Sequence, residues 1–364
     1  MTTDSRAVER SEKRKKDHLK ICIEDDTYQI EDSGQSGYDD ITLIHHALPD
    51  LSFDSLDTSL TFLDYDITYP FFISCMTGGF NKAKRLNHEL AKAAQHLGIP
   101  VGTGSIRALF RYPDLFADFH LKSLTPDVPV ISNLGVTQLK EIPHVTIYEM
   151  LKKLEVQAIA IHLNPGEELV QPEGDKDFTG LMDAFARFAE NCPCQVIVKE
   201  TGCGIKPSLV EDMLKFGADF VDLAGGGGTN WMLVESYRQI PVERDIAREF
   251  DSWGLPTALI QAVLGRDNKR IIASGGIRTG LDIAKSVVMG AQLAGLALPF
   301  IRAVYGNGFD GAVELGNKLA KALKMVMFLT GSRNLEQLRA APFLMEESFK
   351  SKVEQLTFIE GIQS

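Results

Sequence analysis

Eight short apolar segments recur between residues 71 and 298, and stretches of helical periodicity lie between them. The apolar segments are Phe71–Met76, Ile99–Thr103, Val128–Asn133, Ala158–Leu163, Gln195–Lys199, Phe220–Ala224, Arg270–Ala273 and Leu293–Leu298. Near-continuous apolar runs are typical of parallel strands that are buried on both faces. The intervening stretches repeat their apolar residues with the period of a helix, for example over Lys82–Leu97 and Thr179–Ala189. Eight alternating strand and helix units predict a parallel TIM (β/α)8 barrel.

The predicted barrel leaves an extension at each end of the chain. We expect residues 1–70 to form a basic arm and a β-rich cover, residues 71–310 to form the barrel, and residues 311–364 to form helices packed on it, all within one domain. A length of 364 residues suits one barrel with such extensions. The long gap Thr229–Lys269 between two predicted strands must hold an insertion, which we interpret as a lid or an interface element.

Composition and charge exclude several classes of protein. The formal net charge of −11 argues against nucleic-acid binding, which requires a basic surface. We expect no membrane span, because no apolar run approaches the ~20 residues that one requires. The five cysteines show no repeated CxxC spacing, and the first residues lack the apolar segment of a secretory signal. We therefore expect a cytoplasmic protein.

Two glycine-rich turns follow the sixth and seventh predicted strands, at Gly225–Thr229 and Ser274–Gly280. Glycine lets the backbone approach a ligand closely, and the start of a helix favours an anion. In barrels the loops after the last strands often bind a phosphate. The two turns together therefore predict a phosphorylated ligand, although glycine here could also serve only to make tight turns.

Polar side chains cluster at the C-terminal ends of the predicted strands, where barrels place their active sites. They are the hydrogen-bonding residues Thr77, Ser105, Asn133 and Thr229, the cationic residues Arg107, Lys199 and Arg278, and the titratable residues His162, Glu167 and Glu168. This set suits a planar cofactor with polar edges and a phosphate tail. Burying Lys199 would be costly without an anionic partner. It would either stabilise negative charge on a reduced flavin or form a structural salt bridge.

Ordered motifs along nearly the whole chain resemble those of type 2 isopentenyl diphosphate isomerase, an FMN-dependent barrel enzyme. The matching motifs are Arg14-Lys15 with His18, Met76–Gly79, Ser105–Arg107, Asn133, His162–Pro165, Glu168, Gln171–Asp175, Lys199-Glu200, Gly227–Trp231 and Ser274–Arg278. So many matches in the same order make a chance similarity a poor explanation.

The resemblance implies where the ligands bind. FMN would be held by Met76, Thr77, Gly78, Ser105, Asn133, Lys199, Thr229, Gly275, Gly276, Arg278, Ala291 and Gln292. The substrate diphosphate would be bound by Arg14, Lys15, Ser105 and Arg107, with His18 one helical turn beyond the basic pair. Glu168 matches the Mg²⁺ ligand of the family, and His162 is a candidate catalytic residue that orients the substrate.

One position departs from the family pattern, because Glu167 stands where the family has a glutamine that contacts the substrate. An ionised Glu167 would strengthen Mg²⁺ binding but repel a diphosphate, whereas a neutral one would mimic the hydrogen bond of the amide. The neighbouring Glu168 would raise the pKa of Glu167 and Mg²⁺ would lower it, so the sequence leaves the direction of the net pKa shift open. We therefore treat Glu167 as both a substrate-binding and a catalytic candidate.

The implied activity is a 1,3 proton shift between isopentenyl diphosphate and dimethylallyl diphosphate, with reduced FMN and Mg²⁺ as cofactors. The flavin would be reduced beforehand by NADPH or another donor. The family also implies a homotetramer or a homo-octamer.

Two alternatives remain. An FMN-dependent barrel oxidoreductase such as a 2-hydroxy-acid oxidase needs a histidine just before the last phosphate loop, and Gly265–Ser274 contains none. An enzyme similar to IMP dehydrogenase needs a cysteine after the sixth strand, and Gly225–Trp231 contains none. A flavin-binding protein without catalysis is the second alternative, because Glu167 could repel the diphosphate.

Overall fold

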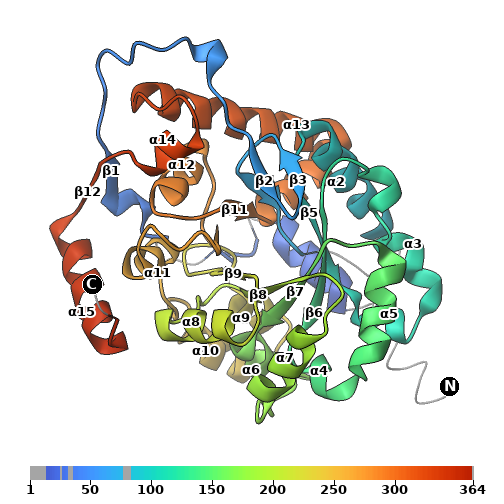
Figure 1. The fold of residues 1–364 in the computed structure, drawn as a ribbon. Coiled ribbons are helices and arrows are strands. Elements are labelled where there is room, and N and C mark those ends of the chain that lie inside the picture. Colours follow the sequence, from blue (N-terminus) through green and yellow to red (C-terminus); the bar gives the residue numbers. More distant parts are fainter. Residues whose placement is uncertain (1–13, 25–26, 32–35, 77–82, 363–364) are drawn as a thin grey trace.

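The computed structural model describes residues 14–24, 27–31, 36–76 and 83–362. Its centre is a closed barrel of parallel strands in the spatial order β10–β11–β4–β5–β6–β7–β8–β9 (Figure 1). These strands are β4 (Phe71–Ile73), β5 (Val101–Ser105), β6 (Val130–Gly135), β7 (Ala158–Leu163), β8 (Gln195–Glu200), β9 (Phe220–Asp222), β10 (Ile271–Ser274) and β11 (Leu293–Leu296). Each strand overlaps one of the apolar segments, so the predicted TIM barrel is confirmed.

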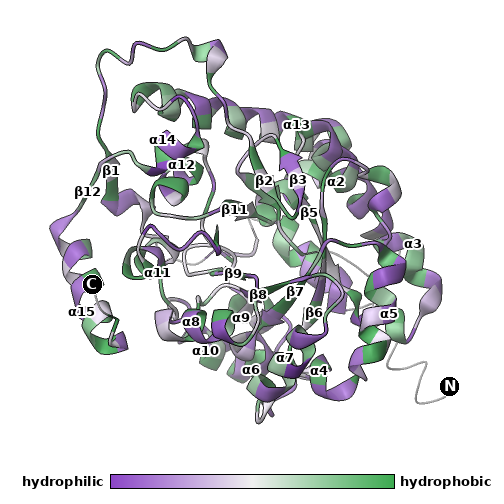
Figure 2. Cartoon of the chain, viewed as in Figure 1, coloured by the Kyte–Doolittle hydropathy of each residue, from purple (hydrophilic) through white to green (hydrophobic). Residues whose placement is uncertain are grey.

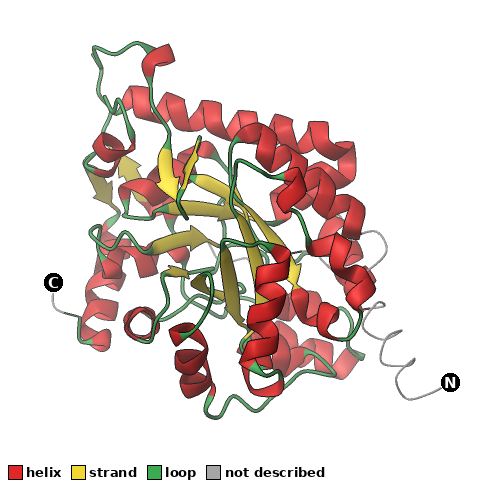
Figure 3. Cartoon of the chain, turned by 45° about the vertical axis from the view of Figure 1, so that its right-hand side comes forward, coloured by secondary structure: helices red, strands yellow, loops and turns green. Residues whose placement is uncertain are grey.

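Helices surround the barrel and cover the outer face of its strands (Figure 3). Those between successive strands include α2 (Ala83–Leu97), α5 (His144–Leu154), α7 (Leu181–Glu190), α8 (Pro207–Lys215), α11 (Thr257–Leu264) and α12 (Gly280–Val288). Shorter helices lie in the loops: α3 (Phe116–Phe119), α4 (Gln138–Glu141), α6 (Pro165–Val170), α9 (Trp231–Ser236) and α10 (Pro241–Arg248). Outer helices such as α2 and α13 carry both hydrophilic and hydrophobic residues (Figure 2). This distribution is expected of helices that bury one face.

A short hairpin covers the N-terminal end of the barrel. It consists of β2 (Leu60–Phe62) and β3 (Tyr65–Ile67), which pair antiparallel. Its buried residues Phe62 and Ile67 pack in one cluster with Phe72 and with Ala158 and Leu293, the first residues of β7 and β11. The hairpin therefore closes this end of the barrel, and the strands open toward solvent only at their C-terminal ends.

Two short strands from the N-terminal and C-terminal extensions pair on one side of the barrel. Strand β1 (Ile41–Leu43) pairs antiparallel with β12 (Phe343–Met345). Helix α13 (Leu298–Leu329) begins directly after the last barrel strand and is interrupted at Asn307 and Gly308, where the backbone is not helical. It is followed by α14 (Leu335–Arg339) and α15 (Glu347–Glu360). None of the helices within the described ranges is long and apolar enough to cross a membrane.

Candidate functional site

A cavity of about 230 Å³ opens at the C-terminal ends of the barrel strands. Each strand supplies at least one lining residue at or just beyond its end: Cys75, Ser105, Asn133, His162, Lys199, Ala224, Ser274 and Ala297 in the order of the chain. The N-terminal arm, which is helical over residues 14–23, also reaches the cavity. The closed barrel thus brings residues from the whole chain to one space.

Most of the predicted site residues line this cavity. Among the predicted FMN-binding residues these are Met76, Ser105, Asn133, Lys199, Thr229, Gly275, Gly276 and Arg278. The predicted substrate and metal residues Arg14, Lys15, His18, Arg107, His162, Glu167 and Glu168 line it too. Thr77 and Gly78 lie outside the described residues. The candidate cofactor and substrate residues therefore share one space.

Ala291 and Gln292 do not lie where the sequence analysis expected them. They precede β11 and therefore lie at the opposite end of the barrel from the cavity. The Gln292 N–H donates to the carbonyl of Ile271, the first residue of β10. The residues beyond the C-terminal end of β11, Ala297 and Leu298, line the cavity instead. The correction follows from the barrel itself, because the residues directly before a strand lie at its N-terminal end.

The two glycine-rich turns pack against each other backbone to backbone. Gly275 and Gly276 have φ values of 90° and 82°, which L side chains rarely adopt. A Cβ atom on Gly275 would overlap the carbonyl oxygen of Gly225, and one on Gly228 would come within 2.6 Å of the Gly276 nitrogen. Glycine is therefore required here by close packing, and it leaves a shallow cradle of main chain at the cavity wall.

Arg278 follows this cradle and already has an anionic partner. Its Nε donates to Oε1 of Glu31 at 2.9 Å, and its Nη2 contacts the same oxygen. Nη1 of Arg302 lies 3.7 Å from the other carboxylate oxygen of Glu31. Glu31 also pairs with Thr229 through an antiparallel bridge, which places the N-terminal segment beside both glycine turns. The sequence analysis missed Glu31, because only the fold brings it near Arg278.

Lys199 has the anionic partner that its burial requires. Its Nζ lies 3.4 Å from Oδ2 of Asp222, whose side chain is 1% exposed. The carboxylate of the next residue, Glu200, instead accepts hydrogen bonds from the backbone N–H groups of Thr201 and Gly202 at 2.6 Å. Burial raises the pKa of Glu200 to about 7, although these N–H groups and others of the same loop oppose the shift.

His162 is a neutral residue in this cavity. Its Nδ1 lies 2.8 Å from Oδ1 of Asn133, which fixes the orientation of the ring. Burial lowers the pKa of His162 to about 4, and the positive charges of Lys199, Arg107 and Arg14 act in the same direction. In the unliganded protein His162 therefore carries no charge near neutral pH: its Nδ1–H donates to Asn133, and its Nε2 can accept a hydrogen bond.

Glu167 and Glu168 share one amide donor. Nδ2 of Asn164 donates to Oε2 of Glu167 at 3.0 Å and to Oε1 of Glu168 at 3.1 Å. Oε2 of Glu168 accepts the backbone N–H of Asp175 at 2.8 Å. Burial raises the pKa of Glu167 to about 8, and the charges of Glu235 and Glu168 add to this effect. Glu167 is therefore mainly a neutral carboxylic acid at pH 7 in the metal-free protein.

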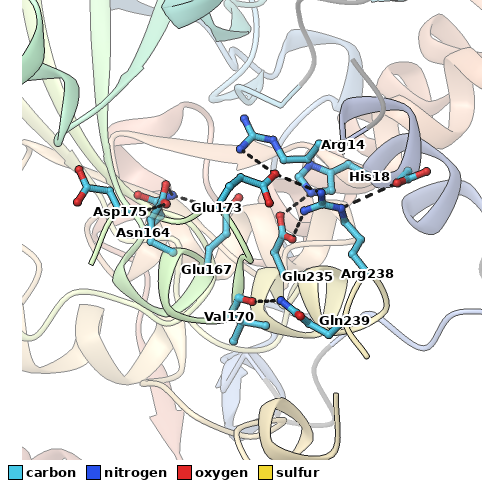
Figure 4. A network of polar contacts seen from close by, with 12 residues as sticks. Arg14, His18, Asn164, Glu167, Val170, Glu173, Asp175, Glu235, Arg238 and Gln239 are labelled. Atoms are coloured by element: carbon cyan, nitrogen blue, oxygen red, sulfur yellow. Dashed lines mark hydrogen bonds and ion pairs between the residues drawn. The ribbon is translucent and has the colours of Figure 1, made fainter. Parts of the chain in front are cut away.

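The N-terminal arm is joined to α9 by a network of ion pairs (Figure 4). Nε2 of His18 lies 2.6 Å from Oε1 of Glu235, and Nη1 of Arg238 contacts the other oxygen of Glu235. Arg238 also lies 3.3 Å from Glu173, which is 3.8 Å from Arg14. Burial alone would raise the pKa of Glu235, but His18 and Arg238 outweigh it and lower that pKa. An ionised Glu235, which does not line the cavity, thus lies near the neutral Glu167, which does.

Metal ligation rests on few side chains. Within the described ranges no group of three or more histidine, cysteine or acidic residues is arranged to hold an ion. Mg²⁺ commonly keeps several waters and takes only one or two carboxylates together with substrate phosphates. Glu168 at the cavity wall fits that pattern. The described residues do not fit a transition-metal site, which would need three protein ligands.

Comparison with known proteins gives one consistent family. The family model described as FMN-dependent dehydrogenase matches residues 127–344. A protein of Borrelia garinii subsp. bavariensis named isopentenyl-diphosphate delta-isomerase is 40% identical over 334 residues, 91% of this chain and 92% of its own length. Proteins of the same name are 38% identical in Pyrococcus abyssi, over 91% of this chain and 92% of theirs, and 37% identical in Halobacterium salinarum, over 96% and 98%.

Solved structures share the fold at much lower identity. A double mutant of flavocytochrome b2 with pyruvate bound aligns with a TM-score of 0.67 at 16% identity, covering 92% of this chain and 84% of that one. A mandelate oxidase mutant with an FMN adduct gives 0.60 at 15% identity, covering 87% and 93%. At these identities the likeness shows the barrel fold and nothing about the reaction.

Proposed function

The chain belongs to the isopentenyl-diphosphate delta-isomerase family, built on the FMN-dependent dehydrogenase fold, and from this premise we propose that it interconverts isopentenyl and dimethylallyl diphosphate by a 1,3 proton shift with reduced FMN and Mg²⁺. One observation carries the proposal. A single cavity joins a glycine cradle suited to a phosphate, a buried lysine, and a basic arm suited to a second phosphate group. The substrate of a 2-hydroxy-acid oxidase carries no diphosphate, so such an enzyme would not need a basic arm.

The residues at the cavity wall fit FMN. Gly275 and Gly276 line the cavity with main chain, and a phosphate can approach glycine main chain closely. Ser105 and Asn133 offer hydrogen bonds, and Lys199 offers a positive charge toward the flavin ring. When bound, reduced FMN would supply a proton donor and a stacking surface that stabilises positive charge on the substrate.

The arm and the strand β5 would bind the diphosphate. The cavity is lined by Arg14 and Lys15 from the arm and by Ser105 and Arg107 at the end of β5. Several cations suit a group of about three negative charges. Glu168 would hold Mg²⁺ against the diphosphate oxygens. His18, expected at the diphosphate, instead pairs with Glu235, so we assign it a role in placing the arm.

Glu167 and His162 would act on the substrate as neutral groups. The protonated carboxyl of Glu167 can donate a hydrogen bond, as the family's amide does, without repelling the diphosphate. His162, whose Nδ1–H donates to Asn133, can accept a hydrogen bond at its other nitrogen. Together with the arm they would orient the alkene and keep water from the reacting carbons.

The wider properties of the family complete the proposal. NADPH would reduce the flavin, with no net redox change per turnover. The protein would act in the cytoplasm as a homotetramer or homo-octamer, without a nucleic-acid partner.

Deuterium incorporation tests the reaction directly. Protein, FMN, Mg²⁺ and dithionite are incubated with isopentenyl diphosphate in heavy water, with oxidised FMN as the control. We expect deuterated dimethylallyl diphosphate only when the flavin is reduced. Binding of FMN without any product under reducing conditions would favour the non-catalytic alternative.

A further inference from the structure

Three buried polar side chains meet beneath the cavity at the ends of adjacent strands. Lys199 is the last residue but one of β8, Asp222 is the last residue of β9, and Ser274 is the last residue of β10. Asp222 is the direct register partner of Lys199. The barrel therefore fixes the three Cα positions independently of any ligand.

Both oxygens of the Asp222 carboxylate are engaged. Oδ2 lies 3.4 Å from Nζ of Lys199, and Oδ1 accepts the hydroxyl of Ser274. The Ser274 hydroxyl oxygen is itself 3.5 Å from the same Nζ. A carboxylate held at both oxygens has one orientation, so it presents its charge to Lys199 in a fixed direction.

Lys199 and Ser274 line the cavity, whereas Asp222 does not. The Asp222 side chain is 1% exposed and that of Lys199 is 11% exposed. Nζ of Lys199 donates to the carbonyl of Glu200 at 3.0 Å, and its contacts to Asp222 and Ser274 are longer than an optimal charged hydrogen bond. An ammonium has three donors, and because two of these three contacts are long, Lys199 can turn a donor toward a ligand in the cavity.

We propose that Asp222 is a positioning residue: it holds the ammonium of Lys199 at the cavity wall, against the polar edge of the bound flavin, and Ser274 locks its carboxylate. This inference rests on the proposed FMN site. It assigns Asp222 to the electronics of the cofactor, although Asp222 does not line the cavity. Without Asp222 the ammonium of Lys199 would lose the ion pair that holds it at the cavity wall.

The midpoint potential of bound FMN tests the inference in the holoenzyme. Lys199→Met removes the positive charge and should shift the potential to more negative values, because the reduced flavin loses a stabilising cation. Asp222→Asn should shift it in the same direction. In the double variant the potential should equal that of Lys199→Met alone, since Asp222 acts through Lys199.

Matched variants separate positioning from folding. Asp118→Asn alters another buried carboxylate, remote from the cavity lining, and should leave the potential unchanged. If Asp222→Asn does not fold, Ser274→Ala should still give a smaller shift in the same direction. An unchanged potential in Asp222→Asn, a positive shift, or an effect that persists in the Lys199→Met background would each overturn the inference. The potential needs no turnover, so an inactive wild type with the expected shifts would refute only the isomerase proposal.

Discussion

Replacing Glu167 by glutamine tests the most unusual feature of this site. Burial, together with the charges of Glu235 and Glu168, raises the pKa of Glu167 to about 8. A group with that pKa is about nine-tenths protonated at pH 7. Glutamine keeps the size and the hydrogen-bonding capacity of the neutral acid but cannot ionise. We therefore expect Glu167→Gln to retain isomerase activity that is equal to or higher than that of the wild type.

The advantage of the variant should grow with pH. If only the neutral form of Glu167 supports turnover, the ratio of variant to wild-type kcat/KM is 1 + 10^(pH − pKa). With a pKa of about 8 this ratio is roughly 1.1 at pH 7, about 2 at pH 8 and about 11 at pH 9. Bound Mg²⁺ stabilises the ionised form, so it should move the rise of the ratio to lower pH.

The assay is kcat/KM with pre-reduced FMN from about pH 5.5 to 9, for both proteins and at several Mg²⁺ concentrations. Loss of nearly all activity in the glutamine variant would show that Glu167 transfers a proton itself. A ratio that does not change with pH would refute the claim that its ionisation limits the wild type.

Stability supplies an independent readout in the metal-free apoprotein. The folded-state pKa of Glu167 lies above its unfolded value near 4.5, so its contribution is fully present below about pH 4.5 and is lost as pH rises toward 8. The Tm of Glu167→Gln should therefore rise relative to that of the wild type across this range.

Four further substitutions have defined outcomes. Glu31→Gln should tighten FMN binding but leave riboflavin binding unchanged, because Glu31 competes with a phosphate for Arg278; equal effects on both ligands in titrations would contradict this. Arg107→Ala and Arg14→Ala should each lose a contact of roughly 1.5–3 kcal/mol, seen mainly as a raised KM for isopentenyl diphosphate; an unchanged KM in both would place the diphosphate elsewhere. Thr279→Ala removes the capping box of α12 and should lower the free energy of unfolding by about 0.5–2 kcal/mol in urea titrations.

The strands could be predicted because burial on both faces imposes a local pattern. Every apolar segment overlaps a strand, since a parallel barrel strand leaves no polar face to confuse the signal. The misplacement of Ala291 and Gln292 had another source, because both residues were taken from the resemblance. The predicted strand Leu293–Leu298 already placed them before its first residue, at the end of the barrel opposite to the site.

Residues whose role depends on distant partners were missed. Asp222 stands in the middle of the apolar run Phe220–Ala224, and only its register with Lys199 gives it a partner. Glu31 lies in an acidic stretch that reads as a loop, and its contact with Arg278 spans 247 residues. Glu235 and Arg238 carried a local signal, an acid and a base three residues apart on an expected insertion, but nothing local tied them to His18.

The contact between His18 and Glu235 links the arm to the protonation of the site. His18 and Arg238 keep Glu235 ionised, and that negative charge is, after burial, the largest cause of the raised pKa of Glu167. The helix that carries Arg14 and Lys15 to the substrate therefore also helps to set the charge of Glu167. An arm that only bound diphosphate would affect KM alone. Because His18 lies on the same helix, loss of the arm should lower kcat as well as raise KM. His18→Ala should reproduce the fall in kcat, whereas Arg14→Ala should mainly raise KM.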